Sequence, residues 1–129
     1  MDILLTIHSF LPLLIVAVAV LAIFKFAIGW LMNSSFKGMD RGLASGLSGL
    51  MDLQVLLGLI IFFISGFGGT GFPAYRIFHL FLMLGAAALA HVPSRLKALG
   101  GKQRFGYSVF AILGALVLVF VGVAVVAGK

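Results

Sequence analysis

Residues 106–127, GYSVFAILGALVLVFVGVAVVA, form an apolar stretch that contains no charged side chain. A helix that crosses the roughly 30 Å of hydrocarbon in a bilayer needs about 20 such residues, because each residue adds about 1.5 Å. Three other runs of this character lie at about 4–31, 43–64 and 73–92. The four runs predict an all-α integral membrane protein with four transmembrane helices.

The composition of the whole chain agrees with this fold class. Of its 129 residues, 63% are apolar and 9% are charged, whereas a soluble domain has about 25% charged residues. So few charges cannot cover the surface of a packed soluble domain, which excludes that class. The chain has no cysteine, and this excludes disulfides, thiolate metal sites, iron–sulfur clusters and covalently attached haem.

The net charge of +6 comes mainly from basic residues between the apolar runs, which do not form the basic face expected of a protein that binds nucleic acid. The first and third connectors carry six of these residues: Lys37, Arg41, Arg95, Lys97, Lys102 and Arg104. The second connector, residues 65–72, carries none. Because cytoplasmic loops are enriched in Lys and Arg, both termini are predicted on the outer, periplasmic side of a bacterial inner membrane.

The connectors are too short to carry the chain back across a membrane, so the sequence predicts one domain, residues 1–129, folded as an up-down bundle. The first run lacks a basic leader and is longer than the core of a signal peptide, so it is predicted to stay as a helix. Small residues at Gly42, Gly46 and Gly49 are expected to pack within the bundle. The alternative is that they form a docking face for a second copy.

Two histidines are expected at matching depth below the outer face. His8 lies near the start of the first run, and His79 lies about one and a half turns into the third. Two neutral imidazoles facing a common apolar interior suit the axial positions of a b-type haem, and Arg76 is placed to bind its propionates. The alternative is that each histidine only bonds to a backbone carbonyl or water.

A second set of polar residues is predicted towards the inner side. His91 is twelve residues beyond His79, about 18 Å further along the helix, so it cannot bind the same iron. It is expected to cap the helix, and the alternatives are that it contacts a quinone or binds a pigment. Lys25 and Asp52 are expected to neutralise each other across two helices, either as a structural pair or as part of a proton path.

Three short segments resemble a known family. They are the opening HSFL at 8–11, the stretch DLQVLLGL at 52–59, and the run from His79 through Met83 to Ala90 and His91. Together they are similar to small four-helix bacterial membrane proteins that are often labelled cytochrome b-like. The resemblance implies that His8 and His79 are the cofactor positions, with His91 as a third matching histidine.

The sequence therefore leaves three functions open. The first is a b-type cytochrome-like subunit that transfers electrons within a larger membrane complex and is not an enzyme by itself. The second is a structural subunit of a respiratory or photosynthetic complex that has no cofactor of its own, or that binds pigment or lipid. The third is a proton-coupled transporter around Lys25 and Asp52. No nucleotide-binding, zinc-hydrolase or nucleophile motif is present.

Overall fold

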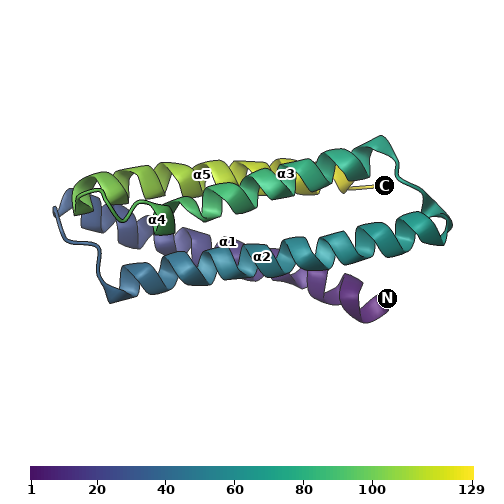
Figure 1. Ribbon diagram of the computed structural model, residues 1–129, viewed down its shortest axis with the longest axis horizontal. Coiled ribbons are helices and arrows are strands. Elements are labelled where there is room, and N and C mark those ends of the chain that lie inside the picture. Colours follow the sequence, from purple (N-terminus) through teal and green to yellow (C-terminus); the bar gives the residue numbers. More distant parts are fainter.

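The computed structural model describes residues 1–129, and all of its regular structure is helical (Figure 1). Four long helices account for most of the chain: α1 (Asp2–Leu31), α2 (Gly38–Ser65), α3 (Ala74–Ala90) and α5 (Gly101–Val126). A five-residue π-helix, η1 (Gly66–Thr70), follows α2, and the short helix α4 (Val92–Arg95) follows α3.

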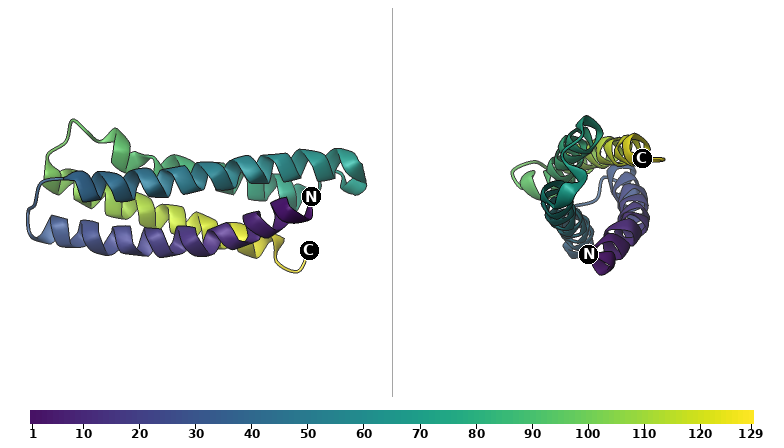
Figure 2. Two further views of the ribbon diagram at one scale, coloured as in Figure 1. Left: turned by 90° about the horizontal axis from the view of Figure 1, so that it is seen from below. Right: turned by 90° about the vertical axis from the view of Figure 1, so that its right-hand side faces the viewer.

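The long helices lie side by side, and each packs against two neighbours (Figure 2). The pairs in contact are α1 with α2, α2 with α3, α3 with α5, and α5 with α1. The backbones of α1 and α3 do not approach each other closely, so these helices stand on one diagonal of the bundle. Both termini lie at the same end as η1, and the connectors after α1 and α4 lie at the opposite end (Figure 1).

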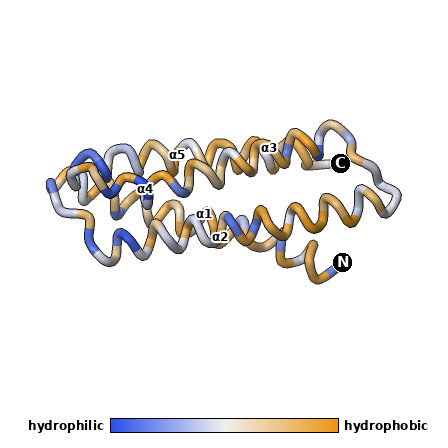
Figure 3. The backbone as a smooth tube through the Cα atoms, in the orientation of Figure 1, coloured by the Kyte–Doolittle hydropathy of each residue, from blue (hydrophilic) through white to orange (hydrophobic).

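Three helical segments are long and apolar enough to cross a membrane: Asp2–Leu31, Gly38–Thr70 and Gly101–Val126. Helix α3 is also apolar but has only 17 residues. The outer surface of the bundle carries large hydrophobic side chains that are more than half exposed, including Phe10, Leu13, Phe24, Phe81, Phe110 and Phe120. Apolar residues follow the helices along most of their length, and hydrophilic ones gather mainly at the end opposite the termini (Figure 3). This surface is that of a membrane protein.

Two helices begin earlier than their apolar runs predict. Helix α2 begins at Gly38 rather than near 43, and α5 begins at Gly101 rather than near 106. The side chain of Asp40 accepts a hydrogen bond of 2.9 Å from the backbone N–H of Lys37, which satisfies a donor that the first turn leaves free. Hydropathy detects the hydrocarbon-crossing part of a helix, whereas capping determines where it starts.

The glycines of α2 do not pack as the sequence predicts. A Cβ added at Gly42, Gly46 or Gly49 would meet nothing within 4 Å, so this stripe faces outward. The face that α2 buries carries larger residues, including Leu47 and Met51. Small residues on α3 and α5 do bring helices together: Gly85 lies against Leu118, Gly114 against Leu89, and Gly122 against Met83.

Candidate functional site

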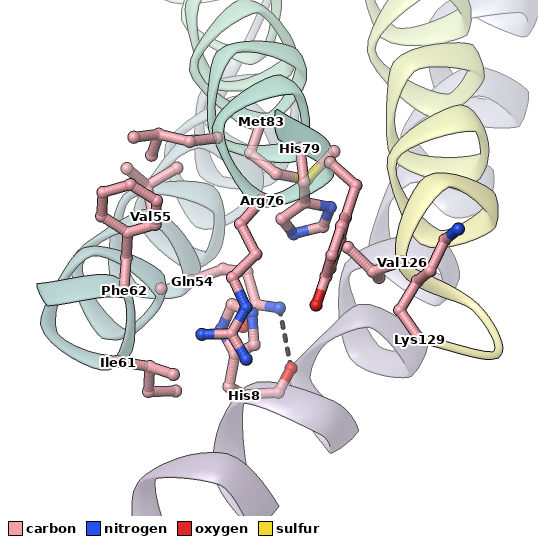
Figure 4. A pocket seen from close by; sticks show the side chains of 13 residues that line it. His8, Gln54, Val55, Ile61, Phe62, Arg76, His79, Met83, Val126 and Lys129 are labelled. Carbon is pink, nitrogen blue, oxygen red and sulfur yellow. Dashed lines mark hydrogen bonds between the residues drawn. The ribbon is translucent and has the colours of Figure 1, made fainter. Parts of the chain in front are cut away.

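His8 on α1 and His79 on α3 line the same internal space, although the backbones of these two helices are not close neighbours. Two adjoining cavities, of about 230 and 290 Å³, lie near the end of the bundle that carries the termini (Figure 4). They share five lining residues, namely His8, Gln54, His79, Met83 and Val126. Together they reach the size range of small-molecule and cofactor sites, about 300–1,000 Å³.

The hydrogen bond made by His79 defines its tautomer. Its Nδ1 lies 2.7 Å from the backbone oxygen of Gly122 on α5. Because a carbonyl oxygen can only accept, Nδ1 carries the hydrogen and Nε2 keeps a lone pair. Metal-binding histidines typically show this arrangement, in which a backbone carbonyl orients the ring and the other nitrogen binds.

Access to this carbonyl depends on the absence of a side chain at Gly122. A Cβ there would collide with the end of Met83 and lie 3.4 Å from Nδ1 of His79. The glycine therefore lets α5 approach α3 closely enough for its backbone to orient the imidazole.

His8 occupies a different environment from His79. Its ring lies over Gly58 of α2, where an added Cβ would stand 3.0 Å from Cε1. Its Nδ1 is buried and has no hydrogen-bond partner. A buried polar atom without a partner is costly, and in a cavity it is the kind of group that a ligand satisfies.

The backbone of His8 is tied to α2 for a reason that the sequence contains. In a regular helix the carbonyl of His8 would accept a hydrogen bond from the N–H of residue 12, but Pro12 has none. The side-chain Nε2 of Gln54 donates to this carbonyl instead, at 2.8 Å (Figure 4). Gln54 is only 6% exposed, and its own Oε1 has no partner. Gln54 thus replaces the bond that Pro12 removes and fixes the helix turn that carries His8.

Two cations border the cavity. Arg76 lies one turn before His79 on α3 and donates a hydrogen bond of 2.7 Å to the hydroxyl of Ser65. The amino group of Lys129 stands 5.7 Å from the centre of the Tyr75 ring. The rest of the lining is mainly apolar, with Val55, Ile61, Phe62 and Leu80. In the view of Figure 4, Lys129 stands at the side of this space, whereas the Arg76 side chain lies between His79 and His8.

These residues fit a b-type haem. A haem with two histidine ligands uses imidazoles on opposite sides of the iron, an apolar slot and cations near its propionates. The diagonal helices carry the two imidazoles, one with an oriented free nitrogen and the other with an unpartnered buried nitrogen. The sequence identified His8, His79 and Arg76, and the structure brings all three to one cavity.

The polar residues further from the termini pair differently from expectation. Lys25 bonds to Asp40 at 2.8 Å, and Asp52 bonds to His91. The expected pair of Lys25 and Asp52 is therefore not formed. Asp52 lies fourteen residues from the start of α2, about 21 Å, whereas Lys25 lies six residues from the end of α1, about 9 Å. A lysine side chain cannot span that difference in depth, and the early start of α2 places Asp40 beside Lys25 instead.

Gln54, Gly58 and Gly122 were not identified as site residues from the sequence. Two spacings in the sequence could have identified part of the surroundings of His8. Pro12 is four residues after His8, and Gly58 is four residues after Gln54. The first spacing predicts an orphan carbonyl at His8, and the second places Gln54 and Gly58 on one face of α2. No comparable signal exists for Gly122, because its contact joins helices far apart in the chain.

Comparison with family models, curated proteins and solved structures gives no match to this chain. The similarity to cytochrome b-like membrane proteins therefore stays a prediction. Function has to be inferred from the cavity and its residues.

Proposed function

We propose that this chain is a haem-binding subunit that transfers electrons within a membrane complex. His8 and His79 would each give a ring nitrogen to the iron, and Arg76 and Lys129 would neutralise the propionates. Bound haem supplies one-electron redox chemistry. The observation that supports this most directly is the hydrogen bond from Nδ1 of His79 to Gly122, which leaves Nε2 free beside the cavity.

The chain's own residues would orient the cofactor and keep water away. Gly122 holds the ring plane of His79, and Gln54 holds the backbone of His8. Phe62 and Val55 contribute apolar surface to the slot. Because the lining of the cavity has a low dielectric constant, it would strengthen the attraction between the two cations, Arg76 and Lys129, and the two propionates of the haem.

We also propose that all four long helices cross a bacterial inner membrane, with both termini on the periplasmic side. The connectors at the opposite end, with the first turns of α2 and α5, carry most of the basic residues. Excess Lys and Arg is typical of the cytoplasmic side. In this orientation the cavity lies near the periplasmic face.

An absorption spectrum tests the haem directly. The protein is expressed with haem supplied, purified in mild detergent and examined for Soret and α bands. We expect His79→Ala and His8→Ala each to abolish the low-spin spectrum, because each removes one axial ligand. His91→Ala is the matched control and should leave the spectrum unchanged, since His91 does not line the cavity. A wild-type protein without bands, or a spectrum that survives His79→Ala, would refute the assignment.

A structural subunit without its own cofactor is the second candidate. The outward stripe of Gly42, Gly46 and Gly49 supports it, because small residues on an exposed helix face allow another helix to approach. Under this proposal the chain co-purifies with a larger complex in mild detergent. Both proposals place the chain in a complex, so the haem spectrum distinguishes them: Soret and α bands that depend on His79 would favour the first proposal.

A further inference from the structure

The end of the bundle opposite the termini, called the basic end below, carries a positive charge that the chain does not neutralise. A single carboxylate there, Asp40, faces seven basic residues: Lys25, Lys37, Arg41, Arg95, Lys97, Lys102 and Arg104. The two other acidic residues lie elsewhere, since Asp2 begins α1 at the opposite end and Asp52 bonds to His91. The excess charge is therefore balanced from outside the chain, by counterions or by a bound anion.

Both oxygens of Asp40 are already engaged. Its Oδ1 accepts a hydrogen bond of 2.8 Å from Lys25, and its Oδ2 accepts one of 2.9 Å from the backbone N–H of Lys37. Asp40 is also only 1% exposed. Arg41 and Arg104 form no ion pair with it or with any other carboxylate. These two guanidinium groups are left without an anionic partner in the protein.

Arg104 is a buried cation whose orientation is fixed. It is only 8% exposed, its Nε donates a hydrogen bond of 3.0 Å to the carbonyl of Pro93, and its Cζ lies 3.8 Å from the centre of the Phe36 ring. These contacts use one of its five N–H donors. The two terminal nitrogens donate to no atom of the protein, and they keep access to the surface. Arg104 thus presents the planar fork with which a guanidinium binds phosphate oxygens.

Arg41 adds a second positive charge near this fork. Its terminal nitrogen turns back towards the start of α2, 3.9 Å from where a Cβ at Gly38 would stand, and its charge repels that of Arg104. An anion that contacts both guanidinium groups replaces this repulsion by attraction. The N-termini of α2 and α5 lie at the same end, and their free N–H groups also favour a negative charge.

Aromatic residues place Arg104 at the level of lipid head groups. The only tryptophan, Trp30, lies against Gly106, and the next residue, Tyr107, is 56% exposed. Tryptophan and tyrosine are enriched at the interface between membrane and water. Arg104 is three residues beyond Tyr107 towards the basic end, a rise of about 4.5 Å along α5. The phosphates of a bilayer lie at this level, just outside the aromatic rings.

We propose that Arg41 and Arg104 bind the phosphate of an anionic phospholipid such as phosphatidylglycerol. The phosphate oxygens accept hydrogen bonds from the terminal nitrogens of Arg104, and Arg41 supplies the second positive charge. Below Arg41, towards the bilayer centre, a Cβ at Gly42 or Gly46 would meet nothing, so an acyl chain can lie close to the backbone of α2. The site is at the opposite end from the haem cavity and does not require a haem.

Titration of the delipidated protein in a neutral detergent, with bound lipids counted by native mass spectrometry, tests the proposal. The matched probes are phosphatidylglycerol and phosphatidylcholine with identical acyl chains. Both contain a phosphodiester, but the choline group cancels its charge. We expect phosphatidylglycerol to bind at least about tenfold more tightly, because two guanidinium groups without a carboxylate favour a head group with net negative charge. Equal affinity for the two lipids would overturn the proposal.

Matched variants locate the site. Arg41→Gln should weaken phosphatidylglycerol binding about tenfold, since it removes a charge that touches the phosphate. Arg95→Gln removes the same charge from an exposed position on α4 and should weaken it at most about threefold, because salt screens distant charges. Both side chains are exposed, so the fold should be retained, and circular dichroism checks the helix content. Equal losses in the two variants would show a diffuse charged surface in place of a site.

Arg104→Lys tests the fork without changing the net charge. Lysine keeps the positive charge but cannot donate two parallel hydrogen bonds, so phosphatidylglycerol affinity should fall about fivefold while phosphatidylcholine binding stays the same. Full affinity in this variant would overturn the role of Arg104. If the variant does not fold, the comparison of Arg41→Gln with Arg95→Gln still decides the proposal.

Two further outcomes would identify another occupant and overturn the proposal. If inorganic phosphate binds the lipid-free protein as tightly as phosphatidylglycerol and displaces it, the site takes a soluble phosphate. If the purified protein shows no preference for phosphatidylglycerol but carries an acidic polypeptide that Arg41→Gln releases, the basic end docks another protein. All of these measurements are made without a haem spectrum, so the lipid site and the haem are tested separately.

Discussion

At the scale of single residues, Pro12 and Gln54 are each unfavourable in their own helix and compensate each other across the bundle. A proline in a helix interior leaves a carbonyl without its donor, and a buried glutamine needs a partner for its amide. The hydrogen bond from Gln54 to His8 satisfies both requirements. This bond joins α1 to α2 at the turn that carries a proposed iron ligand.

Replacing Gln54 by leucine should destabilise the protein, but the loss should depend on residue 12. Gln54→Leu leaves the His8 carbonyl without a donor, which costs about 1–3 kcal/mol. In the Pro12→Ala background the N–H of residue 12 can supply the missing bond, so the same substitution should cost clearly less. A double-mutant cycle of unfolding free energies in mixed detergent measures this coupling.

The cycle has a matched control in Gln103, which is exposed on α5. Gln103→Leu should change the free energy of unfolding little, and by the same amount in the wild type and in Pro12→Ala. If the changes in unfolding free energy caused by Gln54→Leu and Pro12→Ala are strictly additive in the double variant, Gln54 does not replace the hydrogen bond that the proline removes.

At the scale of helices, glycines on different faces have opposite roles. Gly122 of α5 permits contact with α3, because a Cβ there would collide with Met83. Gly46 of α2 faces open space. The same residue type therefore marks a helix contact in one element and a free surface in another, and spacing alone does not distinguish them.

Alanine at these two positions should separate the roles. Gly122→Ala should destabilise the isolated protein by about 1–3 kcal/mol through overpacking and should disturb His79. Gly46→Ala should leave stability unchanged or raise it by up to about 1 kcal/mol, since alanine favours helix. Unfolding in mixed detergent measures both, and the haem spectrum reports on His79. Equal destabilisation by the two variants would contradict the packing described for α2.

At the scale of the whole molecule, the distribution of basic residues predicts how the bundle sits in the membrane. The chain has no cysteine, so single cysteines can be introduced as unique labels. In spheroplasts, Thr70→Cys in η1 should react with a membrane-impermeant maleimide, and Ser35→Cys between α1 and α2 should react only after lysis. Both side chains are exposed. The reverse pattern would invert the proposed orientation.

The sequence predicted the large-scale features because they depend on apolar length, which is a local property. The helical class and the approach of His8, His79 and Arg76 to one cavity follow from such lengths and depths. The partners of Lys25, Asp52 and His91 depend on the relative register of helices. The few residues by which α2 starts early change that register, so Lys25 meets Asp40 and Asp52 meets His91.

The length of α3 has a consequence for the lipids around the protein. Its 17 residues span only about 25 Å, less than the roughly 30 Å of hydrocarbon in a typical bilayer, while the other long helices exceed that thickness. Hydrophobic mismatch of this kind is relieved when the bilayer thins locally, at a fraction of a kcal/mol per Å. With α3 crossing the membrane as proposed, the protein would have one thin side, where short-chain lipids pack best. Water and head groups would then come closest to Asp52 and His91 on that side, which would lower the cost of holding an ionisable pair there.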